Sequence, residues 1–225
     1  MSRVVFDIET LAFPLDSFDD VRRDYLLKFT TTEKEKEEAI QKLSLFPTTA
    51  QIIVIGMLNP DTNRGRILFQ STEPMEFHSD DEMIHFKSGS EEELLQQFWK
   101  DIECYDQFIT FNGRNFDCPF LLLRSAIKRI APTRNLMPYR YDPSIHCDLL
   151  EQLTFYGAMR KFSLDFYCKT FNIESPKSHG ITGLDLGTLY QEGKYEEIAR
   201  YCLGDLVATA ELFRVWNQHL NIRDY

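Results

Sequence analysis

The 225-residue sequence lacks a long hydrophobic run and any C-x-x-C cysteine pair. Its longest apolar stretch, residues 52–58, is far shorter than the ~20 residues that span a bilayer, so we expect no membrane partner. Residues 1–3 lead directly into a strand-like run with no apolar secretory signal, which favours a cytoplasmic location. The five cysteines lie far apart, and this spacing argues against a disulfide framework or a thiolate zinc site.

Positive charge is also scarce, because 25 Lys and Arg residues face 35 Asp and Glu residues, for a net charge of −10. Taken alone, that charge would exclude a nucleic-acid partner, since phosphate binding is driven by Lys and Arg. The acids are concentrated, however: residues 73–106 hold eleven of them against two bases. The rest of the chain is close to neutral, so a nucleic-acid partner stays possible.

The pattern of strands and helices indicates one domain, residues 1–225, with an α/β fold. Strand-like runs occupy residues 3–9, 51–58, 66–70, 107–111 and 144–147, and the second and third form a hairpin. Helical patterns dominate the later part, ending in a long helix over residues 195–219. A charged, helical insertion at about 14–47 follows the first strand. It could be a substrate lid, a partner surface or inert decoration.

Two acids, Asp7 and Glu9, end the first strand. Side chains at i and i+2 of a strand point the same way, about 7 Å apart, so both carboxylates project from one face and Ile8 from the other. Like charges in a buried place repel unless a cation neutralises them. A cation site is one interpretation, and a strand that simply ends in solvent is the other.

Two further patterns are weaker taken singly. Asp117 follows a Gly-containing turn at residues 112–115 and opens a helix, where an acid commonly compensates the helix dipole. Tyr201 and Asp205, at i and i+4 of the last helix, share a face separated by about 6 Å of rise. Such a pair is most often surface or packing chemistry.

Taken in order, the three patterns resemble the three exonuclease motifs of the DnaQ-like 3′–5′ exonucleases, in the DEDDy branch whose third motif carries tyrosine. Residues 161–165 (KFSLD) and 190–194 (YQEGK) add similarity to a stand-alone group related to the proofreading domain of family B DNA polymerases. The resemblance covers nearly the whole chain. It implies a ribonuclease H-like fold: a five-stranded mixed sheet flanked by helices, with the first three strands antiparallel, the rest parallel, and the helical insertion after the first strand.

The resemblance also implies roles for the acids. Asp7, Glu9, Asp117 and Asp205 would hold two divalent cations, and Tyr201 would position the attacking water. Carboxylates are the oxygen ligands that Mg²⁺ or Mn²⁺ prefer, so the residue types agree with these roles. A phenol with an ordinary pKa near 10 stays neutral at pH 7, and it therefore orients water better than it deprotonates it.

Substrate contacts are predicted from two sources. By resemblance, the terminal nucleotide would contact Thr10, Leu11, Asn112 and Phe116. Phe116 is equally well read as a core residue or as a platform for a base. Residues 111–140 carry six bases against one acid, and Arg124 and Lys128 in this run are candidates to guide a phosphate backbone. A solvated helix face explains them equally well.

We expect a metal-dependent 3′–5′ exonuclease that releases nucleoside 5′-monophosphates from single-stranded ends, with DNA favoured over RNA. An exoribonuclease or oligoribonuclease is the close alternative. A catalytically silent nucleic-acid-binding module is the alternative of another class, although loss of a metal ligand would be its usual mark. In the run His146-Cys147-Asp148, a metal site is conceivable, but Asp148 as a helix N-cap is the favoured interpretation.

Overall fold

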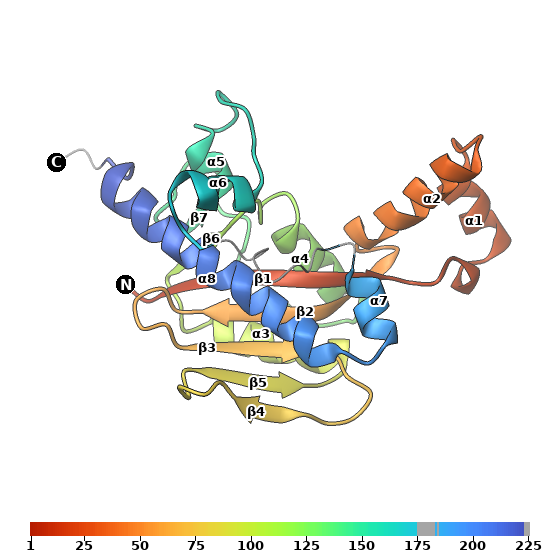
Figure 1. The fold of residues 1–225 in the computed structure, drawn as a ribbon, viewed down its shortest axis with the longest axis horizontal. Helices are drawn as coiled ribbons and strands as arrows, with labels where there is room; N and C mark the ends of the chain where they lie inside the picture. Colours follow the sequence, from red (N-terminus) through yellow and green to blue (C-terminus); the bar gives the residue numbers. More distant parts are fainter. Residues whose placement is uncertain (175–182, 184, 223–225) are drawn as a thin grey trace.

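The computed structural model describes residues 1–174, 183 and 185–222, which form an α/β fold around one mixed sheet (Figure 1). The sheet has seven strands in the order β4-β5-β3-β2-β1-β6-β7. Their bounds are β1 (Arg3–Ala12), β2 (Ala50–Leu58), β3 (Gly65–Phe69), β4 (Glu76–His78), β5 (Ile84–Ser88), β6 (Gln107–Thr110) and β7 (His146–Asp148).

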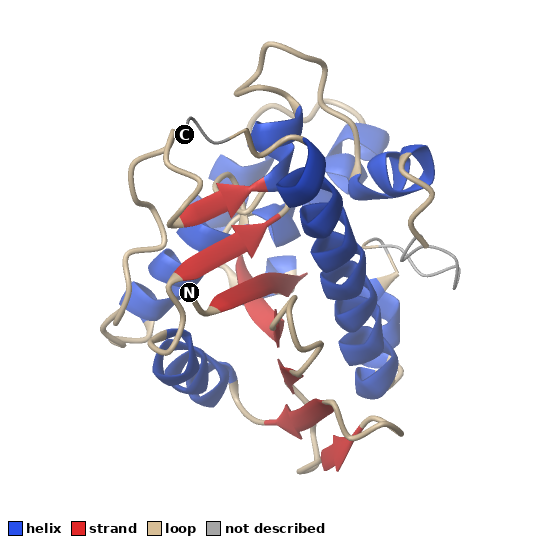
Figure 2. Ribbon diagram, turned by 90° about the vertical axis from the view of Figure 1, so that its left-hand side faces the viewer, coloured by secondary structure: helices blue, strands red, loops and turns tan. Residues whose placement is uncertain are grey.

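Helices cover both faces of the sheet. Their bounds are α1 (Asp20–Leu27), α2 (Glu33–Gln41), α3 (Glu91–Ile102), α4 (Asp117–Ile127), α5 (Leu149–Leu153), α6 (Leu164–Thr170), α7 (Leu186–Gln191) and α8 (Tyr195–His219), with 3₁₀ turns η1 (Leu15–Ser17) and η2 (Lys42–Leu45). The long helix α8 runs across one face, against β1, β2 and β3 (Figure 2), and α3 and α4 pack on the other. Among the described residues, no helix is long and apolar enough to cross a bilayer.

The strand directions confirm the α/β, ribonuclease H-like expectation for five of the seven strands. β1–β2 and β2–β3 are antiparallel, whereas β1–β6 and β6–β7 are parallel. The expected count of five strands was too low, because the acidic segment 73–106 adds β4 and β5 at the far edge of the sheet. In β5 only Ile84 and Phe86 are buried, between charged or polar neighbours. Two inward residues give too short a period-2 pattern to detect.

Several local predictions are confirmed. The hairpin is β2–β3, and α8 begins and ends at the predicted residues. A further local feature is the capping box at the start of α3, in which the Ser90 hydroxyl accepts from the Glu93 N–H while the Glu93 carboxylate accepts from the Ser90 N–H. Each of these features depends on side chains close together in sequence, and for this reason the sequence alone predicts them.

Successive side chains of β1 point alternately to the two faces of the sheet. Val5 packs in the core beneath α8, whereas Val4, Phe6 and Ile8 pack in the core beneath α3 and α4. A strand residue two positions from Val5 faces the same way, so the side chains at positions 7 and 9 point to the α8 side.

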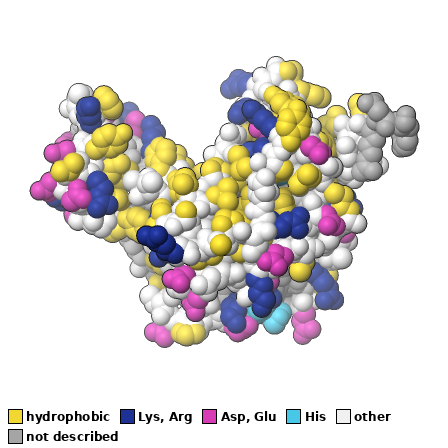
Figure 3. Space-filling model, turned by 180° about the vertical axis from the view of Figure 1, so that it is seen from behind, with side chains coloured by type: hydrophobic (Ala, Val, Ile, Leu, Met, Phe, Trp, Pro, Cys, Tyr) yellow, Lys and Arg dark blue, Asp and Glu magenta, His cyan; other side chains and the backbone are white. Residues whose placement is uncertain are grey.

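The insertion, residues 13–49, has a firm base and an exposed tip. Helices α1 and α2 bury none of their residues and project away from the sheet (Figure 1, orange). Leu43 of η2, 4% exposed, is buried near the base, as are Phe18 and Thr49. Figure 3 shows the surface hollowed between this insertion and the lobe that carries α5 and α6.

Candidate active site

A close contact between β2 and α8 builds one side of the site. Gly56 of β2 pairs with Asp7 of β1, and a Cβ placed on Gly56 would lie 2.5 Å from Cδ1 of Leu206 in α8. Glycine suits this approach, because any side chain would have to displace the buried side chains of Leu206 and Cys202 that α8 packs against the sheet. The helix face that carries Tyr201 and Asp205 therefore reaches the carboxylate of Asp7, whose pKa the charge of Asp205 raises.

The turn between β6 and α4 brings in the third segment. Asn112 has a left-handed backbone (φ 64°), and a Cβ on Gly113 would lie 2.5 Å from the Thr110 side chain, so the chain turns sharply here. The turn places Asp117 at the start of α4, where its Oδ1 accepts a 3.0 Å hydrogen bond from the backbone N–H of Ile8. This bond joins α4 to β1 between the two acids of the strand.

The acids raise one another's pKa values. Burial raises the pKa of Asp7 well above its usual range, and the charges of Asp117, Glu9 and Asp205 raise it further. Burial also raises the pKa of Glu9, with Asp205 and Asp117 adding to the effect. For Asp117, burial dominates and the pKa rises to about 7, although the hydrogen bond from Ile8 opposes it.

Tyr201 lies among the same charges. Burial raises the pKa of its phenol, and the charges of Asp205, Glu9 and Asp7 raise it further. The hydroxyl is therefore neutral at pH 7, so it can donate one hydrogen bond and accept others but does not act as a base. The raised pKa agrees with the neutral phenol that the ordinary pKa of tyrosine predicts.

The donor set fits hard divalent cations. Ligand atoms of Asp7, Glu9 and Cys202 lie within 4.8 Å of one another. In the described part of the chain, no Lys or Arg forms an ion pair with Asp7, Glu9 or Asp117. A buried group of acids that repel one another and lack a basic partner is the electrostatic environment that a bound cation would relieve.

Comparison with known proteins supports this chemistry. The model of a family described as a predicted 3′–5′ exonuclease related to the exonuclease domain of PolB matches residues 70–223. The chain belongs to this family. A search of curated proteins finds no match. The PolB-related exonuclease is thus an enzyme acting on nucleic acid, of a kind that generally uses divalent metals.

The region of the chain that matches the family model does not include every acid of the candidate active site. Asp117, Tyr201 and Asp205 lie within residues 70–223, whereas Asp7, Glu9 and the insertion precede them. The three-dimensional structure joins the two parts, through the pairing of β1 with β6 and through the contact of α8 with both β1 and β2.

The four residues predicted by resemblance to contact a nucleotide have different surroundings. Leu11 packs partly buried against the α8-side core, and Asn112 accepts a 3.0 Å hydrogen bond from Asn115. Thr10 is buried, and its hydroxyl donates to the Ser44 carbonyl at 2.7 Å. The half-buried ring of Phe116 lies 5.4 Å from that of Phe120. Thr10 and Phe116 line, together with Glu9, a pocket of about 630 Å³.

The prediction that Arg124 guides the phosphate backbone is wrong, because its side chain is buried, whereas for the half-exposed Lys128 it stays a prediction. Arg124 is 4% exposed, and its guanidinium makes two hydrogen bonds to Glu91, at 2.8 and 2.7 Å, and one to the Pro47 carbonyl at 3.0 Å. The ammonium of Lys128 lies 3.6 Å from the same carboxylate. The periodicity of α4 could not show this, because the acid that neutralises both cations lies on another helix.

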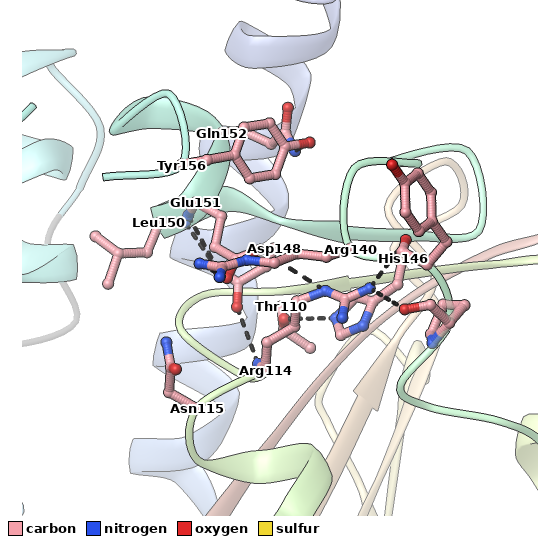
Figure 4. A network of polar contacts seen from close by, with 12 residues as sticks. Thr110, Arg114, Asn115, Arg140, His146, Asp148, Leu150, Glu151, Gln152 and Tyr156 are labelled. Atoms are coloured by element: carbon pink, nitrogen blue, oxygen red, sulfur yellow. Dashed lines mark hydrogen bonds and ion pairs between the residues drawn. The ribbon is translucent and has the colours of Figure 1, made fainter. Parts of the chain in front are cut away.

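A second polar cluster lies at the ends of β6 and β7 (Figure 4). Asp148 accepts hydrogen bonds from the N–H groups of Leu150 and Glu151, which confirms that it is an N-cap, and from those of Asn112 and Arg114, each at 2.9 Å. Glu151 forms ion pairs with Arg114 and Arg140. Two more bases of the predicted basic run are therefore structural.

His146 in this cluster is a structural residue too. Its Nδ1 donates to the Leu136 carbonyl at 3.0 Å, so its Nε2 accepts from the Thr110 hydroxyl at 2.9 Å. Burial lowers its pKa to about 3, with the charge of Arg114 adding to the effect. A neutral ring with both nitrogens occupied does not offer a metal ligand.

The sequence analysis missed the residues that the insertion contributes beside the acids. The pocket next to Glu9 is also lined by Gln41, Lys42 and Leu45. Nothing in the local pattern of η2 singles them out, because their position depends on how the insertion folds back. Cys202 was missed as well, although its Sγ lies 3.9 Å from Oδ2 of Asp7.

Proposed function

We propose that this enzyme removes nucleotides one at a time from the 3′ end of single-stranded DNA, as nucleoside 5′-monophosphates. The observation that supports this most directly is the convergence of Asp7, Glu9, Asp117 and Asp205 from three separate segments: burial raises the pKa values of the first three, and the charge of Asp205 raises each of them further. DNA is favoured because the family is related to the exonuclease domain of PolB. Removal from RNA ends is the second candidate within the same chemistry.

In this proposal the four carboxylates hold two divalent cations, Mg²⁺ or Mn²⁺. Bound there, the cations would stabilise the charge on the attacking and leaving oxygens of the displacement. Tyr201, kept as a neutral phenol by burial and by the surrounding acids, orients the water oxygen toward phosphorus. As the water oxygen bonds to phosphorus it releases one proton to solvent, the bond from phosphorus to the 3′-oxygen of the preceding nucleotide breaks, and that oxygen takes up one proton.

The charge distribution is compatible with a polyanionic substrate. Much of the excess acid lies in residues 73–106, the segment that forms β4, β5 and α3 at the far edge of the sheet or on its opposite face. The site itself is negative only until cations bind. A strand would therefore meet a neutralised site, and its approach would be repelled mainly from the acidic edge.

The test is a strand labelled at its 5′ end and incubated with Mg²⁺ or Mn²⁺, in parallel DNA and RNA versions of one sequence. We expect a ladder of products shortened from the 3′ end, faster for DNA, and no shortening in EDTA. Faster loss of the RNA strand would favour the exoribonuclease. Intact strands of both kinds, with well-folded protein and metal present, would favour the silent binding module.

A further inference from the structure

The insertion after β1 lies outside the region matched by the family model, and its base forms one wall of the pocket beside Glu9. That pocket, of about 630 Å³, is within the usual range for small-molecule sites, roughly 300–1,000 Å³. Its lining comes from β1, from the start of α4, from two residues at or before the start of α7 and from the insertion: Glu9, Thr10, Glu38, Gln41, Lys42, Ser44, Leu45, Phe116, Gly183 and Leu186.

The wall is held firmly against the sheet. Thr10 donates from its hydroxyl to the Ser44 carbonyl at 2.7 Å, and Thr49 donates to the Leu43 carbonyl at 2.7 Å. Arg124 donates to the Pro47 carbonyl, and its guanidinium lies 5.3 Å from the centre of the Phe13 ring. These contacts fix both chain ends of the insertion, so η2 is a rigid part of the site while the tip stays in solvent.

A bulge in the sheet lies where the base of the insertion is attached to β1. The β1–β2 register shifts between Glu9 and Thr10, and beside the shift the N–H of Ile52 donates to Glu91 at 2.9 Å. The same carboxylate binds Arg124, which holds Pro47. One network thus links the bulge beside the metal-binding acids to the base of the insertion.

The chemistry of the wall is suited to a nucleotide. Leu45 is 52% exposed and Phe116 is half-buried, so both present apolar surface on which a base can lie. Lys42 has an exposed side chain, and no ion pair joins it to an acid within residues 1–174, 183 and 185–222. An unpaired ammonium in a pocket that also contains Glu9 and Glu38 is a phosphate-binding group more than a structural one.

We propose that the insertion is part of the substrate site: Leu45 contacts the base of the 3′-terminal nucleotide, opposite Phe116, and Lys42 binds a phosphate of the strand. This inference rests on the proposed exonuclease function. It assigns to the insertion a role in substrate binding. The base of the insertion is required for that binding, and the tip is not.

The test uses pairs of variants that differ only in whether the residue lines the pocket. Leu45 and its neighbour Phe46 are equally exposed, at 52% and 53%, but only Leu45 lines the pocket. Lys42 is matched by Lys28, an exposed residue at the end of α1. The variants are Leu45→Ala against Phe46→Ala, and Lys42→Gln against Lys28→Gln.

Two measurements are made on the full chain with Mg²⁺. The first is calorimetric binding of thymidine 5′-monophosphate and, separately, of inorganic phosphate. We expect Leu45→Ala to weaken nucleotide binding about tenfold, because the apolar groups that the base would cover are lost, and to leave phosphate binding unchanged. Phe46→Ala should change neither. Equal nucleotide binding by Leu45→Ala and Phe46→Ala would overturn the assignment of the base.

The second measurement is KM for a labelled single strand as a function of salt. Removing one phosphate contact should reduce the slope of log KM against log salt concentration by about 1 for Lys42→Gln, and Lys28→Gln should keep the slope of the unmodified protein. Identical slopes for the two variants would refute the phosphate contact. If the unmodified protein cleaves no strand, the proposed function fails, and the binding experiment with the nucleotide still tests the pocket separately.

Discussion

Glu9 and Glu91 are both buried glutamates, 8% and 4% exposed, and they lie on either side of the bulge between β1 and β2. Glu91 is surrounded by donors: two hydrogen bonds from Arg124, a contact with Lys128 and the N–H of Ile52. Glu9 is surrounded by acids, which together with burial raise its pKa. Compensated charge is therefore structural here, and uncompensated charge marks the place where cations are expected to bind.

The same contrast separates the two clusters of acids. Asp148 and Glu151 are buried with arginines and backbone N–H groups, whereas Asp7 and Asp117 are held together without a basic partner among the described residues. Burial alone does not tell a functional acid from a structural one. The identity of its neighbours does, and each prediction below changes one neighbour or one charge.

The largest effect is expected for Asp7→Asn. Loss of a metal-binding carboxylate should lower the rate of strand cleavage on the order of 10³-fold or more, because several kcal/mol of transition-state stabilisation are lost. In EDTA at pH 8 the same variant should be more stable than the unmodified protein. The folded-state pKa of Asp7 is raised, so its ionised form opposes folding at every pH above the unfolded value.

Cleavage assays and urea unfolding in EDTA measure the two effects of Asp7→Asn. The exposed Asp80→Asn is the matched control and should change neither. A variant that cleaves normally would remove Asp7 from the site. One that is inactive but less stable in EDTA would show that this carboxylate is compensated by a partner, as Glu91 is.

The opposite effect on stability is expected for Glu91→Gln, which should destabilise the protein. This change leaves the buried guanidinium of Arg124 without its counter-charge, so the free energy of unfolding should fall by about 3 kcal/mol. Urea unfolding monitored by tryptophan fluorescence measures it, with the exposed neighbour Glu92→Gln as control. A loss no greater than that of the control would mean that the network contributes little, and the contrast with Glu9 would then fail.

The smallest effect concerns pH. The pKa of His146 is lowered to about 3, below its ordinary value of 6.5, so the unfolded chain binds a proton that the folded protein does not. Its contribution to stability is complete above pH 6.5 and is lost as the pH falls toward 3, by about 1.4 kcal/mol per unit.

The His146 contribution is measured as a difference, because the acids of the active site titrate in the opposite sense. Their raised pKa values mean that protonation relieves repulsion, so they add stability as the pH falls through about 7. Between pH 6 and pH 4 the unfolding free energy of the unmodified protein should fall further, or rise less, than that of His146→Gln, because only the unmodified protein carries the His146 loss. Exposed His219→Gln should reproduce the unmodified dependence, and if His146→Gln does so as well, the lowered pKa is refuted.

These comparisons also show what the sequence could and could not reveal. Asp7 and Glu9 were assigned to one face by the alternation of a strand, and Tyr201 and Asp205 by the period of a helix. Both are local rules, and the structure has the residues on those faces. Local rules cannot tell which acid on another helix faces a given base, and the prediction for Arg124 was therefore wrong.

The insertion was the other gap. Its helices were predicted from composition, but nothing in residues 41–45 indicates that they fold back beside Glu9. That arrangement depends on the bulge, on Glu91 and on Arg124, which lie far apart in the chain and meet only when the sheet has formed. The strands β4 and β5 were missed for a different reason, since each contributes too few inward residues to make a pattern.

Gly56 carries no functional group, yet it sets the distance between the sheet and α8. A substitution there that kept the fold would leave every acid in the sequence while moving Tyr201 and Asp205 away from the acid of β1. The result would be a folded but inactive variant that keeps every one of these residues and does not bring them together. A genetic screen for loss of function should therefore recover position 56 together with the carboxylates, although an inventory of reactive groups would never point to it.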